Sequence, residues 1–158
     1  MFEVGDKVVY PMHGAGVVEA ITRREFLGEE RRYYILKFLL GDMQVMVPAD
    51  LAQERGIRPV AEPEEVAKLR TILLEPKEKE KALNDWNRRY RSNLEKIKSG
   101  EMVQVAQVVK TLLQRAKDKG LSNGERKMLD NARQILCSEL CLSLGTENAD
   151  AFLQEVMG

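Results

Sequence analysis

Apolar and polar residues alternate over the first sixty positions with the period of short β-strands. Four runs rich in Val, Ile, Tyr and Phe are separated by turn residues, and they lie at Lys7–Tyr10, Gly16–Ile21, Tyr33–Leu39 and Met43–Val47. Four or five strands of this length predict a small SH3- or Tudor-like β-barrel. A barrel of this kind more often binds other molecules than catalyses a reaction.

Two of these runs carry further information. The run Tyr33–Leu40 is almost continuously apolar, which predicts a central strand buried on both faces. The last run stops at Pro48, as edge strands do, and an exposed edge can pair with a strand of a partner. Its alternate residues form two faces, one made by Met43, Val45 and Val47 and the other by Gln44 and Met46. The alternative is a hairpin strand packed within the barrel.

After Pro59 the apolar positions take the period of amphipathic helices. We predict helices at Pro63–Leu74, Leu83–Ile97, Met102–Ala116 and Ser122–Leu140, followed by a short one around Phe152 and Val156, with a charged linker at Lys77–Lys81. The helix at Ser122 is expected to open with a capping box formed by Ser122 and Glu125. The chain is therefore expected to be an α+β protein of two domains. The β-barrel covers residues 1–60, a helix and charged linker cover 61–82, and an all-α helical bundle covers 83–158.

The net charge of the chain is zero, with 25 basic and 25 acidic residues, but the charges are unevenly distributed. The segment from Trp86 to Leu136 holds twelve Lys and Arg against five Asp and Glu, a net charge of +7. Residues 137–158 hold four acidic residues and no basic one. A partner that carries phosphates is therefore expected to contact the third quarter of the chain.

The only tryptophan, Trp86, begins a segment in which three arginines and a tyrosine follow within five residues. Cations neutralise phosphates while a flat ring can stack on or wedge against a base, so this mixture is typical of nucleic-acid binding. Arg88 and Arg91 share one polar face of the predicted helix. Trp86 itself also belongs to the apolar stripe of that helix, so the alternative is that its ring fills the core.

The sequence gives little support to other kinds of chemistry. It has no phosphate-cradling loop, and its only histidine, His13, has no nucleophile near it, so we expect no enzyme. Cys137 and Cys141 are four residues apart and are interpreted as small core residues, so no metal and no cofactor are expected. Without an apolar run of membrane-spanning length or a signal peptide, a cytoplasmic location is expected, with no membrane or small-molecule partner.

Four segments together resemble the CarD/CdnL family of bacterial transcription regulators. They are spread over nearly the whole length of the chain and lie at Val4–Gly14, Leu40–Ala49, Trp86–Lys96 and Gly120–Leu136. The resemblance implies a Tudor-like domain that docks on the β subunit lobe of RNA polymerase through its sheet edge. It also implies a helical domain that contacts promoter DNA at the upstream fork of the bubble, so that open complexes accumulate and the protein is carried to the nucleoid by polymerase.

By position in that family, Trp86 would wedge into the minor groove. The phosphate contacts would be Arg88, Arg89, Arg91 and Arg126, and the polymerase contacts would be Arg24, Val45, Met46 and Val47. Met46 stands where some family members have arginine, so this contact would be apolar. We also expect no long basic tail after Gly158. The alternatives are a protein–protein adaptor whose helical domain does not touch DNA, and a nucleic-acid chaperone that acts without polymerase.

Overall fold

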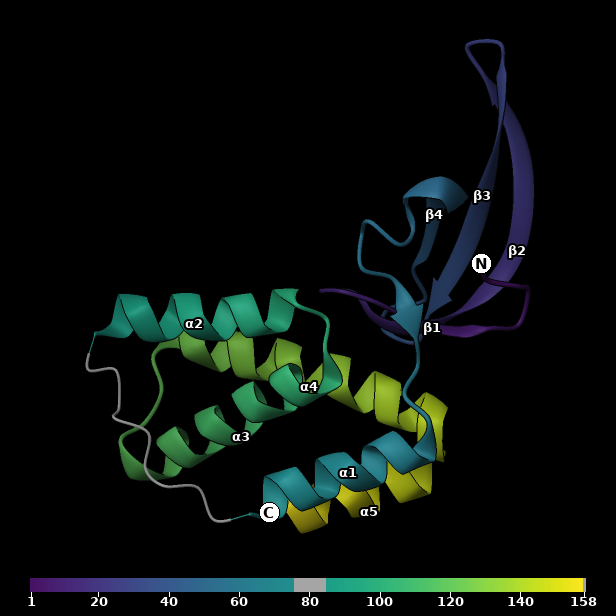
Figure 1. The fold of residues 1–158 in the computed structure, drawn as a ribbon. Helices are drawn as coiled ribbons and strands as arrows, with labels where there is room; N and C mark the ends of the chain where they lie inside the picture. The colour runs from purple at the N-terminus through teal and green to yellow at the C-terminus, as the bar shows by residue number, and fades with distance from the viewer. Residues whose placement is uncertain (76–84, 158) are drawn as a thin grey trace.

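The computed structural model describes residues 1–75 and 85–157, which form an antiparallel sheet followed by helices (Figure 1). Within these residues the sheet has five strands, in the spatial order β4-β3-β2-β1-β5. The strands are β1 (Lys7–Tyr10), β2 (Gly14–Phe26), β3 (Glu29–Phe38), β4 (Gln44–Pro48) and β5 (Arg58–Pro59). In this part of the chain β4 and β5 each pair with one neighbour, so the sheet has two edges and the predicted barrel is not confirmed.

The position and burial of β3 differ from the sequence prediction. The middle strand is β2, and β3 buries only one face, on which Tyr34, Leu36 and Phe38 lie. Side chains on the opposite face, such as Ile35, remain partly exposed. The reason is that the buried face of β3 is covered by the 3-10 helix η1 (Ala49–Leu51) and the turn after it, whereas on the opposite face of the sheet α4 packs mainly against β2. An apolar run alone cannot show whether both faces of a strand are covered.

The hairpin of β2 and β3 projects beyond β4 as a long arm (Figure 1). β4 pairs with β3 only as far as Tyr33, whereas β2 and β3 continue to pair for four more residues on each strand. Leu27 and Gly28 close the arm with positive φ angles of 52° and 80°. This is the two-residue turn whose twist suits a hairpin, and glycine adopts it without strain.

The helices are α1 (Pro63–Leu74), α2 (Trp86–Lys98), α3 (Met102–Asp118), α4 (Asn123–Leu144) and α5 (Thr146–Met157). The capping box that the sequence predicts at Ser122 is confirmed, because Ser122 and Glu125 bond reciprocally to each other's backbone N–H. α4 is the longest helix and packs against α3, α5 and the sheet. The predicted start of α2 at Leu83 and the linker at Lys77–Lys81 lie outside the described residues.

The first helix belongs to the bundle and does not stand apart as a connector. Val66, Leu69 and Leu73 of α1 lie in the same buried cluster as residues of α3, α4 and α5. α1 runs beside α5 (Figure 1), and the Arg70 guanidinium forms a two-point ion pair with Glu155 across the pair of helices. The helical body of the protein therefore begins at Pro63.

Candidate nucleic-acid interface and docking edge

Trp86 is the first residue of α2, and its side chain lies at the surface with 42% of its area exposed. The ring is nevertheless held in place. It stacks on Tyr90, with the ring centroids 5.1 Å apart and an angle of 21° between the planes. Its indole Nε1–H donates to Ser122 Oγ at 3.0 Å. Trp86 is therefore a fixed surface ring rather than a core side chain.

Both rings lie against Gly124 in the first turn of α4. A Cβ atom at this position would lie 3.6 Å from Trp86 Cζ2 and 3.6 Å from Tyr90 Cε2, which is ordinary van der Waals contact. A methyl group would therefore fit at this position, whereas a larger side chain would meet the stacked pair. The first turns of α2 and α4 meet at this point.

Ser122 joins the tryptophan to the capping box of α4. Its Oγ accepts from Trp86 Nε1 and from the Glu125 backbone N–H, the latter at 3.2 Å, and lies 3.1 Å from Glu125 Oε1, to which it can donate. The orientation of the ring is therefore linked to the start of α4. From the sequence, Ser122 and Glu125 are recognisable only as a helix cap, because nothing in their spacing connects them with Trp86.

Glu125 is buried and sits between two arginines. Its carboxylate is 3.9 Å from Arg89 Nε and 3.6 Å from Arg115 Nε. The side chains are 3% exposed for Glu125, 16% for Arg89 and 23% for Arg115. The structure therefore places Arg89, which the family resemblance implies to be a phosphate contact, in an internal ion cluster beneath the surface that carries Trp86.

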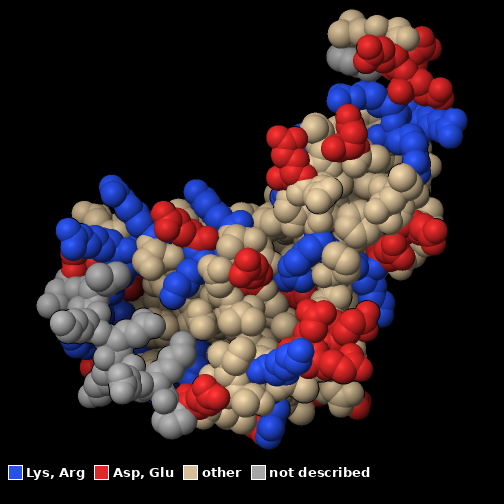
Figure 2. Space-filling view, in the orientation of Figure 1, with Lys and Arg blue, Asp and Glu red and all other residues tan. Residues whose placement is uncertain are grey.

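The other three predicted phosphate contacts are exposed. The Arg88 side chain is 77% accessible and is 4.0 Å from Asp85, the N-cap residue of α2. Arg91 is exposed one turn further along α2, and Arg126 is exposed in the first turns of α4. Figure 2 shows Lys and Arg side chains gathered over α2 on the upper surface of the bundle. The three exposed arginines therefore come from the two helices whose first turns meet at the aromatic pair.

β4 forms an edge of the sheet, which is one of the two alternatives that its sequence leaves open. Its residues alternate as expected, with Met46 exposed and Val47 fully buried in the sheet core. Val45 is half-buried on the same side as Val47. Of the three residues that the resemblance implies as polymerase contacts on this strand, Met46 has a side chain that is 39% exposed, whereas the side chain of Val47 is fully buried.

Arg24 lies on the projecting arm within a group of four arginines, the arginine arm, made of Arg23, Arg24, Arg31 and Arg32. Arg23 pairs directly with Arg32 across the two strands, and Arg24 pairs with Arg31. Like charges that face each other across a strand pair destabilise it, which makes this an unfavourable arrangement in isolation. Figure 2 shows the resulting blue belt below the acidic tip of the arm.

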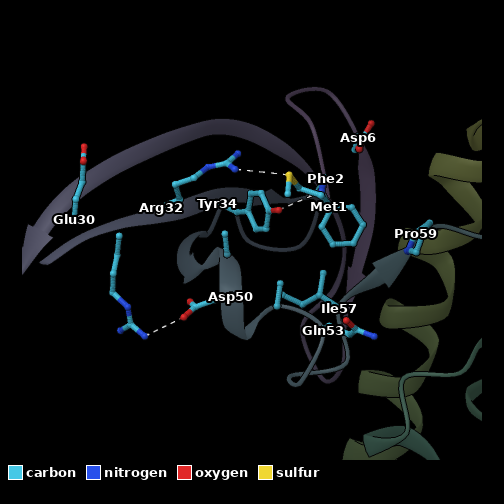
Figure 3. Close-up of a pocket in the computed structure, with 13 residues that line it drawn as sticks. Met1, Phe2, Asp6, Glu30, Arg32, Tyr34, Asp50, Gln53, Ile57 and Pro59 are labelled. Carbon is cyan, nitrogen blue, oxygen red and sulfur yellow. Dashed lines mark hydrogen bonds and ion pairs between the residues drawn. The ribbon is translucent and has the colours of Figure 1, made fainter.

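A hollow of about 960 Å³ lies beside the arginine arm, between the sheet and η1 (Figure 3). Phe2 and Tyr34 form its aromatic part: the Phe2 backbone N–H donates to the Tyr34 hydroxyl at 3.1 Å, and the rings meet edge to face at 5.7 Å. At the rim Arg31 pairs with Asp50 at 3.2 Å. One arginine of the arm is thereby held against η1.

Two further predictions concern the cysteines and the membrane. Cys137 and Cys141 are half-buried rather than fully enclosed, and with Leu39 and Leu40 they line a hollow of about 490 Å³ between α4 and the sheet. Within residues 1–75 and 85–157, no three His, Cys, Asp or Glu side chains gather as they would around a metal ion. Of the helices in these ranges, none is both long and apolar enough to cross a membrane.

Both halves of the chain match family models, and the two matches follow the structural division. The model described as CarD-like/TRCF RID domain matches residues 2–61, which hold the sheet. The model described as CarD, C-terminal domain matches residues 68–154, which hold the helices. The chain belongs to the CarD family. It is also 42% identical over 142 residues to YdeB, a proposed transcription factor of Bacillus subtilis (strain 168), covering 89% of this chain and 90% of that protein.

Membership of the CarD family makes the chain a transcription regulator of a type associated with RNA polymerase. The two matched regions also separate the two surfaces described above. The β4 edge and the arginine arm lie in the region matched by the first model, and Trp86 with its arginines lies in the region matched by the second.

Proposed function

We propose that this protein binds the β subunit of bacterial RNA polymerase through its sheet and stabilises the open promoter complex through its helical bundle. In this proposal the β4 edge and the arginine arm dock on polymerase. Trp86 contacts the upstream fork of the bubble from the minor-groove side, and Arg88, Arg91 and Arg126 contact the DNA backbone. Melted promoter is then favoured over reclosed duplex.

The observation that carries the proposal is the state of Trp86. A large aromatic ring that is 42% exposed costs solvation free energy, yet this ring is fixed by Tyr90 and Ser122. A wedge needs this combination, because a ring already held in one orientation loses little conformational entropy when it meets DNA. The exposed arginines beside it supply the charge that a DNA backbone attracts.

The energetics require a second contact to polymerase. Unstacking one base step costs a few kcal/mol, and a small basic patch alone binds DNA with a dissociation constant of about 10⁻⁴–10⁻⁶ M at physiological salt. Docking on polymerase raises the effective concentration of the patch at the fork, so that weak DNA contacts suffice. The proposed role therefore uses both halves of the molecule.

Arg89 takes a different role in this proposal from the one its family position implies. Its guanidinium lies against the buried Glu125 carboxylate, and its side chain is 16% exposed. In this proposal Arg89 supports the surface under Trp86, and the three exposed arginines contact the DNA backbone. Acidic residues at the tip of the hairpin and at Asp50 offset the charge of the arginine arm, but its arginines form a separate belt, so the polymerase surface opposite this belt is expected to be acidic.

The lifetime of open complexes after a competitor challenge tests the proposal. Wild-type protein should prolong the lifetime on a promoter with its cognate polymerase. Trp86→Ala should lose most of the effect, and the Arg88→Ala/Arg91→Ala variant should lose part of it. All should bind polymerase with unchanged affinity. Lys68→Ala is the matched control, because Lys68 is an exposed cation on α1, away from the aromatic pair.

Two results would contradict the proposal. If wild-type protein binds polymerase without changing the lifetime, the adaptor alternative replaces it. If wild-type protein binds free duplex tightly at physiological salt and needs no polymerase, the chaperone alternative replaces it. A circular dichroism melt of each variant separates loss of function from loss of folding.

A further inference from the structure

The contact between the sheet and the helical bundle is built around one buried carboxylate. Glu139, in the middle of α4, is almost completely enclosed. It accepts two hydrogen bonds from the Arg58 guanidinium, both at 2.7 Å, and a third from the Ala61 backbone N–H at 2.8 Å. Both oxygens of the carboxylate are thus satisfied by the segment that leaves the sheet.

Arg58 also reaches a third element. Its Nε–H donates to the backbone carbonyl of Gly100 at 2.9 Å, in the turn between α2 and α3. One guanidinium therefore connects β5, the middle of α4 and the end of the helix that begins with Trp86. The β1–β2 turn packs at the same place, since a Cβ atom on Gly100 would lie 2.6 Å from Pro11 Cγ.

Neighbouring bonds extend this connection along α4. The Ala15 N–H donates to Ser138 Oγ at 2.9 Å, Lys7 Nζ donates to the Leu142 carbonyl at 3.1 Å, and Ser143 Oγ donates to the Ala61 carbonyl at 2.6 Å. These bonds are directional, and each pairs the region of the sheet with a defined position on α4. The sheet therefore has a defined orientation on the bundle.

We propose that Arg58 is a positioning residue that fixes the angle between the docking sheet and the α2 helix. The inference rests on the proposed function. When β4 and the arginine arm dock on polymerase, the fixed angle places Trp86 at the fork. A buried ion pair often adds little stability compared with apolar residues of the same size. The two-point contact between Arg58 and Glu139 therefore contributes mainly by fixing the orientation of the groups that it joins. Binding through two surfaces of one protein is tighter than binding through one surface only if the geometry allows both to make contact at the same time.

The test replaces both partners so that no charge is left unpaired in the interior. The seam variant, which lacks the ion pair between the sheet and the bundle, is Arg58→Met/Glu139→Met. The matched control is Arg70→Met/Glu155→Met, because that pair is also a two-point Arg–Glu contact but joins α1 to α5 within the bundle. Each protein is measured for affinity to polymerase, for affinity to free duplex DNA and for open-complex lifetime. Residual dipolar couplings of the backbone amides report how the sheet and the bundle are oriented.

The seam variant should bind polymerase and duplex DNA within about twofold of wild type and yet lose most of the lifetime extension. Its dipolar couplings should require separate alignment tensors for the sheet and the bundle. The control should match wild type in all measurements. A seam variant that keeps the full lifetime extension, or whose couplings fit one tensor with the wild-type orientation, would overturn the positioning role. Absence of lifetime extension by wild-type protein would instead overturn the proposed function, and the couplings would still decide the orientation.

Discussion

Replacing Glu125 by glutamine should remove one negative charge from beneath the Trp86 surface while keeping the helix cap. Glutamine at the third position of a capping box can still reach back to the N-cap backbone N–H. The substitution therefore isolates the ion cluster with Arg89 and Arg115 from the capping role of the same side chain. Glu125→Ala removes both.

The magnitude follows from burial and distance. Breaking a buried ion pair by removing one partner costs about 3–5 kcal/mol when the other charge is left without compensation. Here the two arginines keep 16% and 23% of their exposure, and the contacts of 3.9 Å and 3.6 Å are longer than hydrogen bonds. Solvent therefore compensates part of the loss, and we expect Glu125→Gln to lower the free energy of unfolding by about 2 kcal/mol. For a chain of this length that corresponds to a fall in Tm of about 4–8 °C.

The assay is urea unfolding at neutral pH, followed by circular dichroism, with a thermal melt in parallel. Glu125→Ala should cost about 1 kcal/mol more than Glu125→Gln, because it also removes the cap. Glu147→Gln is the matched control, since Glu147 is an exposed first-turn acid of α5, and it should cost about 0.5 kcal/mol through the helix dipole. If Glu125→Gln and Glu147→Gln agree within about 0.5 kcal/mol, the ion cluster contributes nothing and the reasoning is wrong.

The same variant should lower stability without lowering its affinity for DNA. Glu125→Gln raises the net charge of the basic surface by one and removes the negative charge that faces Arg89 and Arg115. It should therefore bind duplex DNA at least as tightly as wild type, and its affinity should fall with salt at least as steeply. Weaker DNA binding by a folded Glu125→Gln protein would show that the cluster is needed to present the DNA surface.

Three further predictions test the packing. Gly16→Ala should lower the free energy of unfolding by at least about 2 kcal/mol in urea unfolding, because its Cβ would lie 2.4 Å from the Lys37 carbonyl oxygen of the neighbouring strand; unchanged stability would contradict the register of β2 and β3. Gly124→Leu should displace the Trp86 ring and shift its fluorescence to the red, whereas Gly124→Ala should not, since that Cβ would make only ordinary contacts. Burial raises the pKa of the Cys137 thiol, so iodoacetamide should modify this thiol at higher pH in the folded protein than in urea. The stability that the shift contributes is present below the pKa of the unfolded state and is lost as the pH rises through the pKa of the folded state.

Elements with local punctuation could be predicted from the sequence. The predicted helix at Pro63–Leu74 agrees with α1 at both ends, because proline suits a first helical turn and Pro76 limits its other end. The capping box at Ser122 gave the start of α4 for the same reason. Pro48, which cannot donate to a sheet ladder, made β4 a candidate edge strand, and the order of the strands decides between this and the alternative.

Features that depend on distant contacts could not be predicted. The partner of Arg89 is Glu125, which comes from another helix, and no spacing rule connects them. The sequence left Trp86 between core and surface, and the contact with Ser122, 36 residues away, decides its position. The burial of Val47 could not be predicted, because alternation along β4 separates two faces but does not tell which face is covered.

The most direct test of the central claim is site-specific photocrosslinking from the neighbour of the tryptophan. A benzophenone amino acid at Asn87, which is exposed beside Trp86 and leaves the ring in place, is incorporated and irradiated in open complexes with polymerase. The same probe at Lys68 serves as the control. We expect crosslinks to promoter DNA at the upstream fork from Asn87 and none from Lys68. Crosslinks from Asn87 to protein but not to DNA, in open complexes that contain the labelled chain, would contradict the proposed contact with the fork.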